Sequence, residues 1–378
     1  MAKKVRVGVI FGGRSGEHDV SIRSANAVIE AINPSKYQVI PIAISEAGRW
    51  LAPRHSMRLL SEPADKKLSA APQPATNDDI AILGDPSHAG LVSLNPNGEN
   101  ESSAPIDVIF PVLHGTYGED GTIQGLLEMA NMPYVGCGVL ASACGMDKVA
   151  MKILFRDAGL PICKYIWFLR SEWRNDQTGV LKRSQREIGF PCFVKPANLG
   201  SSVGVSKATD RSSLIKAIDL AARYDRKIII EEGLNAREIE CAILGNDEPS
   251  ASLPGEYLIH EESARFLDYT EKYSSTGHVE FVVPAPLSKA MTSKIQRLAI
   301  KAFKSVDGTG LARVDFFLRH DTKELVVNEL NTLPGLTEVS GYPKMWAASG
   351  LKFPQLIDRL IALAFERHRD KSENATSR

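Results

Sequence analysis

The sequence predicts a mixed α/β and α+β protein that begins with a doubly wound α/β domain. An apolar segment, Val5 to Phe11, has the composition of a buried parallel strand and ends at Gly12-Gly13. A helical pattern from Asp19 to Ile32 follows, and Val39 to Ile44 has the pattern of the next strand. A strand, a loop, a helix and a second strand in this order indicate the start of a doubly wound sheet.

The chain then leaves this pattern and returns to it. Residues 52–105 are rich in Pro, Ser, Asn and Asp and lack sustained periodicity, so we expect a surface excursion of short elements. A strand is expected at Ile106 to Leu113 and a helix from Thr122 to Ala130. Asp147 is expected to cap a helix through Asp157, which glycine and proline then stop. One face of that helix is expected to carry its apolar side chains: Val149, Ala150, Ile153, Leu154 and Ala158.

Two α+β regions are expected beyond residue 145. The first has a helix at 214–224 and strands at 193–196, 205–207 and 227–231. The second has strands at 311–319 and 325–330 and a terminal helix at 351–368, followed by a frayed polar tail. The expected domains are therefore residues 1–145, 146–232 and 233–378.

Composition excludes several classes of function. Lys plus Arg and Asp plus Glu each number 45, so the formal net charge is zero and a nucleic-acid partner is not expected. No apolar segment approaches the ~20 residues that span a bilayer, and the N-terminus shows no secretory signal. We therefore expect a cytoplasmic protein without a membrane partner. The cysteines form no CxxC pair and are expected to be reduced thiols: Cys137, Cys144, Cys163, Cys192 and Cys241.

The strand pair expected at residues 311–331 carries the most informative polar pattern. Residues two apart share one face of a strand, so Arg313 and Asp315 point the same way, as do Glu329 and Asn331. If the two polar faces coincide, two carboxylates, an amide oxygen and a guanidinium converge. Such oxygen ligands, with phosphate oxygens and water, suit Mg²⁺. The spacing alone fits a solvated strand face equally well.

A glycine-rich loop follows the strand that contains Lys195. Gly200, Gly204 and the two serines between them allow backbone N–H groups to approach a phosphate closely. Lys195 adds a point charge for the same anion. The order of residues is not that of a Walker A loop, and a tight hairpin turn would need the same glycines.

Other chemistry-bearing side chains lie at strand ends. Glu231 and Glu232 follow an isoleucine-rich strand, with Leu234 and Glu238 just beyond, where backbone groups can pair with a purine edge and a carboxylate with ribose hydroxyls. Glu17 follows the first strand, at the end of the sheet where doubly wound proteins bind ligands, and could hold an ammonium group. A charged turn or helix cap explains each pattern as well.

Two observations remain open on residue type alone. The segment 264–277 is polar, aromatic and poorly periodic, which is typical of a mobile lid whose Lys272 reaches a phosphate and whose Tyr273 closes over substrate. An ordinary surface loop has the same composition. His114, which precedes a glycine, either orients an anionic substrate or is a structural histidine with satisfied hydrogen bonds.

Taken together, these segments resemble the D-alanine–D-alanine ligases of the ATP-grasp superfamily, from Val5 to about Phe365. The resemblance implies the ATP-grasp fold, with an N-terminal Rossmann-like domain, two α+β domains and ATP between the second and third. The matching motifs occur in the order FGGRSGEHDVS (11–21), LHGTYGEDGTIQG (113–125), GMDK (145–148), FVKPANLGSSVGVSK (193–207), EEGLNAREIE (231–240), DYTEKY (268–273), ARVDFF (312–317) and VNELNTLPGLTEVS (327–340).

The resemblance also implies a role for each matching position. The residues expected at ATP are Lys148, Lys195, Ser202 and Lys272 at the phosphates, Glu231, Glu232 and Leu234 at adenine, Glu238 at ribose, and Asn331 beside the metals. The residues expected to hold two Mg²⁺ ions, for which Mn²⁺ is a possible substitute, are Asp315, Glu329 and Asn331. The residues expected at the amino-acid substrates and in catalysis are Glu17, His114, Ser201, Tyr273, Arg313, Gly335 and Ser340.

The mechanism that this resemblance implies has two steps. The carboxylate of the first D-alanine attacks the γ-phosphate of ATP, and the amine of the second D-alanine then displaces phosphate from the resulting acylphosphate. The expected product is a peptidoglycan precursor, and the expected assembly is a homodimer. Three alternatives stay open: a D-alanine–D-lactate type enzyme, another ATP-grasp carboxylate–amine ligase, and a nucleotide-binding protein without catalysis.

Overall fold

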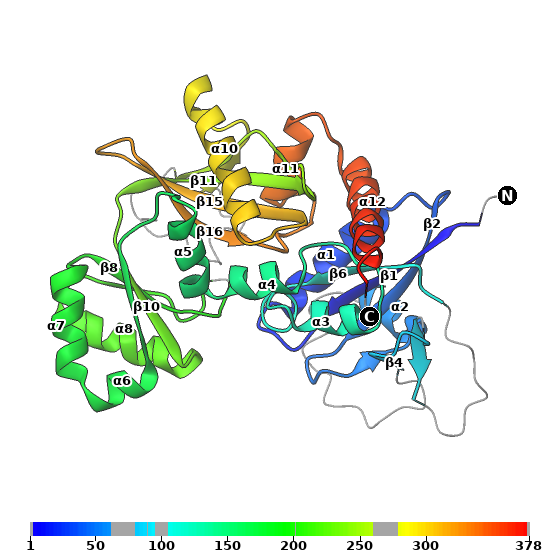
Figure 1. Ribbon diagram of the computed structural model, residues 1–378, viewed down its shortest axis with the longest axis horizontal. Coiled ribbons are helices and arrows are strands. Elements are labelled where there is room, and N and C mark those ends of the chain that lie inside the picture. The colour runs from blue at the N-terminus through cyan, green and yellow to red at the C-terminus, as the bar shows by residue number, and fades with distance from the viewer. Residues whose placement is uncertain are drawn as a thin grey trace.

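The structure is a computed structural model that describes residues 3–61, 80–88, 90–94, 105–200, 202–259 and 279–375. In these ranges the strands form four sheets. Figure 1 shows the N-terminal sheet on the right, the sheet that contains β8 and β10 on the left, and the largest sheet between them. No helix in the described ranges has both the length and the apolar character needed to cross a bilayer.

The N-terminal sheet has the strand order β3-β2-β1-β6. Its strands are β1 (Val5–Gly12), β2 (Tyr37–Ile44), β3 (Trp50–Leu51) and β6 (Val108–Leu113). The central strand β1 pairs in parallel with β2 and β6. Side chains from α1 (His18–Ala31) pack with Val7, Val9 and Phe11, whereas α3 (Thr122–Met129) packs with Ile10 in a second cluster. Helices on both faces confirm the doubly wound prediction.

The excursion at residues 52–105 contains short elements, as predicted. They are α2 (Pro53–Ser61), β4 (Ile80–Ile82) and β5 (Leu91–Ser93), of which the two strands form a separate antiparallel pair. Ser56 of α2 is buried and donates a hydrogen bond to the Leu51 carbonyl, so the helix is tied to the edge of the N-terminal sheet.

The second sheet is antiparallel and has the order β7-β10-β8-β9. Its strands are β7 (Tyr165–Leu169), β8 (Cys192–Pro196), β9 (Ser206–Ala208) and β10 (Lys227–Glu232). The helices α6 (Arg170–Asn175), α7 (Gln177–Glu187) and α8 (Arg211–Tyr224) cover one face, and they bury Val194, Ile228 and Ile230. Because side chains alternate along a strand, Lys195, Ile229 and Glu231 lie on the other face.

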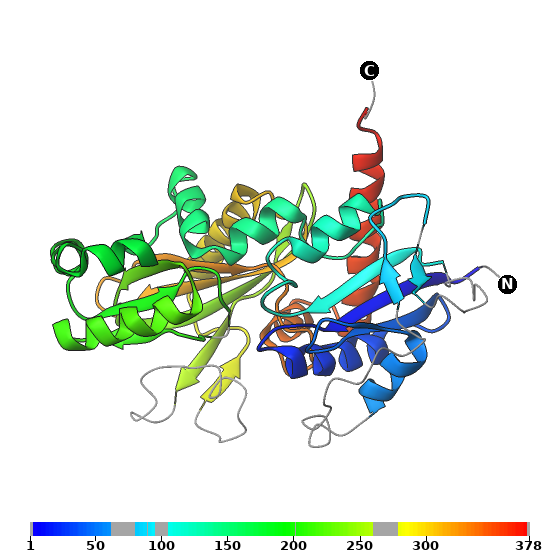
Figure 2. The same cartoon turned by 90° about the horizontal axis from the view of Figure 1, so that it is seen from below.

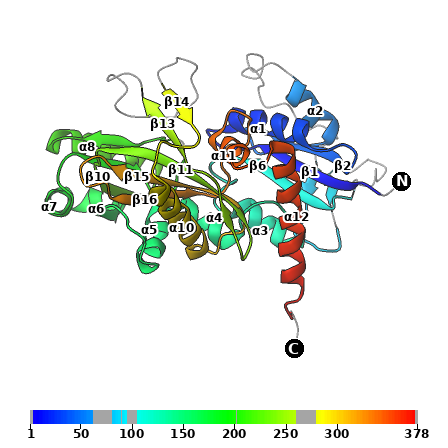
Figure 3. The same cartoon turned by 90° about the horizontal axis from the view of Figure 1, so that it is seen from above.

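The largest sheet joins strands from the last 145 residues. Its order is β14-β13-β11-β15-β16, and β12 pairs with β11. The bounds are β11 (Ala236–Gly245), β12 (Ser250–Ala251), β13 (Gly255–Ile259), β14 (Val279–Val282), β15 (Gly310–Arg319) and β16 (Leu325–Asn331). The helix α10 (Lys289–Ser305) buries Ile295, Ala299 and Phe303 against one face. Figure 3 shows β13 and β14 projecting from this sheet.

The helices α4 (Val139–Met146) and α5 (Lys148–Asp157) connect the N-terminal sheet to the rest of the chain. Asp147 caps α5 as predicted, because its carboxylate accepts the backbone N–H groups of Val149 and Ala150. The predicted apolar face of α5 is confirmed at Val149, Leu154 and Ala158, which are buried or pack against a core cluster, and is wrong at Ile153. Its buried residues are Val149, Met151, Lys152 and Phe155, whereas Ile153 is 41% exposed. Packing of α5 against β16 and α10 selects this face.

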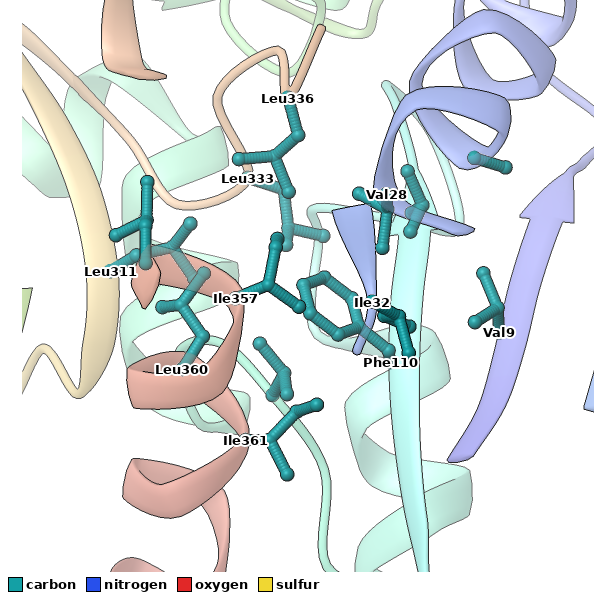
Figure 4. Packing of buried hydrophobic residues seen from close by; sticks show 14 of the residues in the cluster. Val9, Val28, Ile32, Phe110, Leu311, Leu333, Leu336, Ile357, Leu360 and Ile361 are labelled. Carbon is teal, nitrogen blue, oxygen red and sulfur yellow. The ribbon is translucent and has the colours of Figure 1, made fainter. Parts of the chain in front are cut away.

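The C-terminal helix α12 (Phe353–Ser372) packs against the N-terminal sheet, after α11 (Gly341–Ala348). Figure 4 shows Ile357 and Ile361 of α12 beside Phe110 of β6, and Leu360 beside Leu311 of β15. The helix is longer than predicted, because residues 369–372 continue it rather than fraying. In Figure 2 the end of α12 projects from the body of the molecule.

Candidate active site

Two adjoining cavities lie where the three larger sheets meet. The larger has a volume of about 560 Å³ and is lined by residues of β8, β10, β11, β15 and β16. The smaller, of about 130 Å³, is lined by residues from the loops after β1, β6 and β16. The two share lining residues, including Gly200, Ser202, Glu329 and Asn331. A ligand that fills the larger cavity therefore reaches the smaller one.

The predicted metal residues converge at the junction of these cavities. Asp315 on β15 is the direct cross-strand partner of Glu329 on β16, and Arg313 is the partner of Asn331. The Asn331 amide donates to Asp315 Oδ2 at 3.1 Å. A register shift follows Asp315, so Phe316 pairs with Val327. The expectation that the polar faces of the two strands coincide is confirmed.

These residues fit a divalent cation by the chemistry of their donors. Asp315, Glu329 and Asn331 all line the larger cavity, and their oxygen atoms are the type that Mg²⁺ prefers. In the described part of the chain, no group of three or more His, Cys, Asp and Glu side chains is arranged to hold a metal ion. Asp315, Glu329 and Asn331 are not a group of that kind, because the third side chain, Asn331, is an amide.

Two lysines predicted at the phosphates line the larger cavity. Lys148, the first residue of α5, donates to the Leu199 carbonyl at 2.6 Å, and burial lowers its pKa. Lys195 on β8 lies 2.7 Å from Glu231 Oε2. Glu231 also meets Lys152 Nζ at 3.0 Å through Oε1. Burial opposes ionisation of Glu231, but the two lysines outweigh it and lower the pKa of this carboxyl to about 2.

The residues predicted at adenine and ribose lie along one wall of the larger cavity. Glu231, Glu232, Leu234 and Glu238 all line it. The side chain of Glu231 is turned toward Lys152 and Lys195, and Glu232 accepts the backbone N–H of Lys164 at 2.8 Å. Glu238 lies near the start of β11.

The smaller cavity brings together four predicted residues from distant segments: Glu17, His114, Arg313 and Gly335. Glu17 precedes α1, and a Cβ atom at Gly200 would lie 2.9 Å from its Oε1, so the glycine leaves room for the carboxylate. Arg313 donates to Asp315 at 2.7 and 2.6 Å and lies 3.4 Å from Glu240. An acid and a guanidinium therefore face the same small space.

His114 has structural partners at both ring nitrogens. Nε2 lies 3.0 Å from Ser24 Oγ, and Nδ1 lies 3.2 Å from the Leu333 carbonyl and 3.7 Å from Glu119 Oε1. Burial disfavours the charged ring, but Glu119 and Glu17 outweigh it and raise the pKa of His114. The two expectations for this residue are thus compatible, because a histidine fixed in place also lines the smaller cavity.

The other predicted residues differ in their relation to the cavities. Ser202 has a left-handed backbone, with φ of 57°, and lines both cavities. Ser340 is buried, and its Oγ lies 2.7 Å from Thr337 Oγ1, outside the lining that the described residues form. The predictions for Ser201 and for Lys272 and Tyr273 of the lid lie outside the described residues.

Sequence reasoning missed four residues of the site. Glu119, Glu240 and Tyr257 line both cavities, and Lys152 lies behind them, paired with Glu231. Glu119 and Glu240 stand inside motifs already singled out, but only folding shows that they face the site. Lys152 follows Lys148 by one helical turn, and this spacing was an available signal.

Comparison with solved structures supports the same class of protein. A D-alanine–D-alanine ligase from Coxiella burnetii aligns with a TM-score of 0.82 and 37% identity, over 98% of this chain and 97% of that one. The VanG D-Ala:D-Ser ligase from Enterococcus faecalis aligns with a TM-score of 0.81 and 35% identity, over 96% and 100%. The fold and the paired cavities define a ligase with the ATP-grasp fold.

Sequence comparison identifies the family. The models described as D-ala D-ala ligase N-terminus and C-terminus match residues 6–137 and 154–362. A D-alanine–D-alanine ligase from Heliobacterium modesticaldum is 47% identical over 375 residues, which are 99% of this chain and 98% of that protein. The chain belongs to the D-alanine–D-alanine ligase family.

Proposed function

We propose that this chain joins two molecules of D-alanine to D-alanyl-D-alanine, with release of ADP and phosphate, and so supplies a precursor of peptidoglycan. The observation that carries the proposal is the junction of the two cavities. The larger has space and charge for a nucleotide, and the smaller has opposite charges for an amino acid. The acceptor of a phosphoryl group must lie beside its donor, and this junction provides that arrangement.

ATP is the substrate assigned to the larger cavity. Lys148 and Lys195 at its inner wall would contact the phosphates, together with backbone N–H groups of the loop that includes Ser202. Glu231, Glu232 and Leu234 would border adenine, and Glu238 the ribose. Lys272, outside the described residues, would reach the phosphates from the lid.

Asp315, Glu329 and Asn331 would hold two Mg²⁺ ions, with Mn²⁺ as a possible substitute. Bound there, the ions neutralise charge on phosphate oxygens during transfer. Asp315 and Glu329 are already held on neighbouring strands, so little rearrangement of the backbone is required. The support for this assignment is the donor chemistry and the position of the three side chains in the larger cavity.

The smaller cavity is assigned to D-alanine. Glu17 would pair with the ammonium group of the first molecule, so that its carboxylate points at the γ-phosphate. That carboxylate oxygen forms a bond to phosphorus as the bond between the β- and γ-phosphates breaks and ADP leaves. Ser201 and Tyr273 would link Glu17 to the lid, which excludes water from the acylphosphate.

The second step forms the amide bond. The neutral amine of the second D-alanine attacks the carbonyl carbon of the acylphosphate, and the resulting tetrahedral intermediate expels phosphate. Arg313 and the Gly335 backbone N–H would stabilise the oxyanion, because both line the smaller cavity. His114 would orient an anionic group of the substrate, and Ser340 would help to hold the second carboxylate.

We also propose that the protein acts in the cytoplasm as a homodimer, without a nucleic-acid or membrane partner. The support for location and assembly is the resemblance to the family, and the support against a nucleic-acid partner is the balanced charge. D-lactate and D-serine remain the alternative second substrates to test, since a D-Ala:D-Ser ligase is among the similar structures.

The test is phosphate release from MgATP, with the mass of the product determined. The substrate mixtures are D-alanine, L-alanine, D-alanine with D-lactate, and D-alanine with D-serine. We expect release that requires D-alanine and a product with the mass of D-alanyl-D-alanine. A depsipeptide or a D-alanyl-D-serine mass in preference to that product would change the proposed second substrate. No release from any mixture, despite ATP binding, would contradict the proposed reaction.

A further inference from the structure

Lys152 is a fully buried cation behind the larger cavity. It lies on α5 one turn beyond Lys148, and its side chain is 1% exposed. Its ammonium meets Glu231 Oε1 at 3.0 Å, the Asn328 carbonyl at 3.2 Å and Cys163 Sγ at 3.6 Å. These protein atoms enclose the ammonium, and Lys152 is not among the residues that line the larger cavity.

The charge of Lys152 nevertheless bears on nucleotide binding through Glu231. The two oxygens of this carboxylate are divided between Lys152 and Lys195, and its side chain is 3% exposed. The three groups together carry one net positive charge. Without Lys152 the buried carboxylate would pair with Lys195 alone, and the net charge of Glu231 and Lys195 together would be zero. Coulomb attraction is strong in such a water-poor site, so this loss is not screened away.

Lys152 also contacts the opposite wall of the cavity. The register of β15 and β16 passes from Asp315–Glu329 to Phe316–Val327 and leaves Asn328 without a cross-strand partner. The carbonyl of Asn328 accepts the Lys152 hydrogen bond, and the next residue is Glu329. One ammonium group therefore connects β10, which carries Glu231, to the bulge in β16.

We propose that Lys152 is a positioning residue for the nucleotide site. It neutralises Glu231, so that the charge of Lys195 remains available to the phosphates of ATP, and it fixes the backbone beside Glu329. This inference rests on the proposed use of ATP. Lys152 itself would touch no substrate. It would set the charge and the spacing of other residues that do contact the substrate.

The test compares two variants that differ in charge balance. Lys152→Met removes the cation but keeps an unbranched apolar stem. The double variant Lys152→Met/Glu231→Gln removes the carboxylate as well, so the net charge of the three groups is again one positive charge, carried by Lys195. Lys182→Met on the exposed side of α7 is the matched control. The readouts are the dissociation constant of the non-hydrolysable analogue AMP-PNP with Mg²⁺, kcat, and KM for ATP and for D-alanine.

We expect Lys152→Met to weaken AMP-PNP binding by roughly tenfold or more and to raise KM for ATP more than KM for D-alanine. The double variant should bind more tightly than Lys152→Met, because the net charge of the three groups is restored. Wild-type affinity in Lys152→Met, or binding by the double variant as weak as that of the single variant, would overturn the inference. A role in packing alone predicts the second of these results.

Two other experimental outcomes, a variant that does not fold and a wild type that does not react, can be told apart from failure of the inference. If Lys152→Met does not fold, Lys152→Gln takes its place, because this neutral side chain keeps N–H donors for the protein atoms around it, and the same loss of AMP-PNP affinity is expected. If the wild type binds AMP-PNP but releases no phosphate with D-alanine, the proposed reaction fails while the comparison of affinities still tests Lys152. The two proposals therefore fail on different measurements.

Discussion

Arg313 donates two parallel hydrogen bonds to the carboxylate of Asp315, at 2.7 and 2.6 Å. Asp315 lines the larger cavity and Arg313 the smaller one, so this pair spans the boundary between the two. In the proposed reaction, the carboxylate would act on the nucleotide and the guanidinium on the reacting acid. Substitutions at the two positions should for this reason affect different steps of the reaction.

Arg313→Met should leave ATP binding nearly unchanged and reduce kcat by about 10²–10³-fold, because an interaction made with the oxyanion is lost. Phosphate release and AMP-PNP binding, measured on the same preparation, check this. Arg313→Lys should not restore kcat fully, since a lysine cannot reproduce the paired hydrogen bonds. Equal losses in ATP affinity and turnover would count against the assigned role.

Glu17→Gln should lower kcat/KM for D-alanine by at least about tenfold, because a neutral amide no longer pairs with an ammonium group. KM for ATP should change much less, since Glu17 lines the smaller cavity. Glu30→Gln, on the exposed side of the same helix, is the control and should behave as the wild type. Initial rates over a range of both substrates separate the two effects.

Glu231 predicts a particular sensitivity to acid. Its pKa falls from 4.5 to about 2 on folding, so its contribution to stability is complete above pH 4.5 and is lost as the pH falls toward 2. The size of that contribution is about 3 kcal/mol. Urea unfolding of the wild type should show this loss. Lys152→Met/Glu231→Gln should show a shallower decline over the same interval, and parallel curves would contradict the assignment.

Arg367→Met should lower the free energy of unfolding by about 2 kcal/mol or more. Arg367 on α12 donates to the Tyr134 and Gly136 carbonyls and to Thr309 Oγ1, and it lies 4.0 Å from the centre of the Tyr134 ring. Arg359→Met on the same helix is the control. It breaks an exposed pair with Glu366 and should cost less than about 1 kcal/mol. Urea titration compares the two variants.

Local patterns in the sequence predicted much of the fold. The cap of α5 at Asp147 and the parallel strand β1 were predictable because both depend on neighbouring residues alone. β11 was not predicted as a strand, since Gly233 and Asn235 give its start the appearance of a turn. The elements β13, β14 and α10 were not assigned, although they complete the largest sheet and its core.

The candidate site was also predictable only where its residues are related by a local pattern. Alternation predicted that Arg313 and Asp315 share one face of their strand, as do Glu329 and Asn331, because alternation is a local property of strands. That the two polar faces coincide depends on the pairing of β15 with β16, which the structure shows. The contact between Lys152 and Glu231 joins segments far apart in the chain, and no local period reports it. The roles assigned to the site residues stay predictions, and Ser201, Lys272 and Tyr273 lie outside the described residues.

The return of α12 to the N-terminal sheet has a consequence for biosynthesis. Val9 of β1 and Phe110 of β6 share a core with Ile357 and Ile361 of α12, which are translated well after them. The apolar surface of the first sheet therefore stays partly uncovered until α12 has been synthesised. A nascent chain that stalls before α12 is synthesised would expose this surface to chaperones and proteases, even though residues 1–352 were already made.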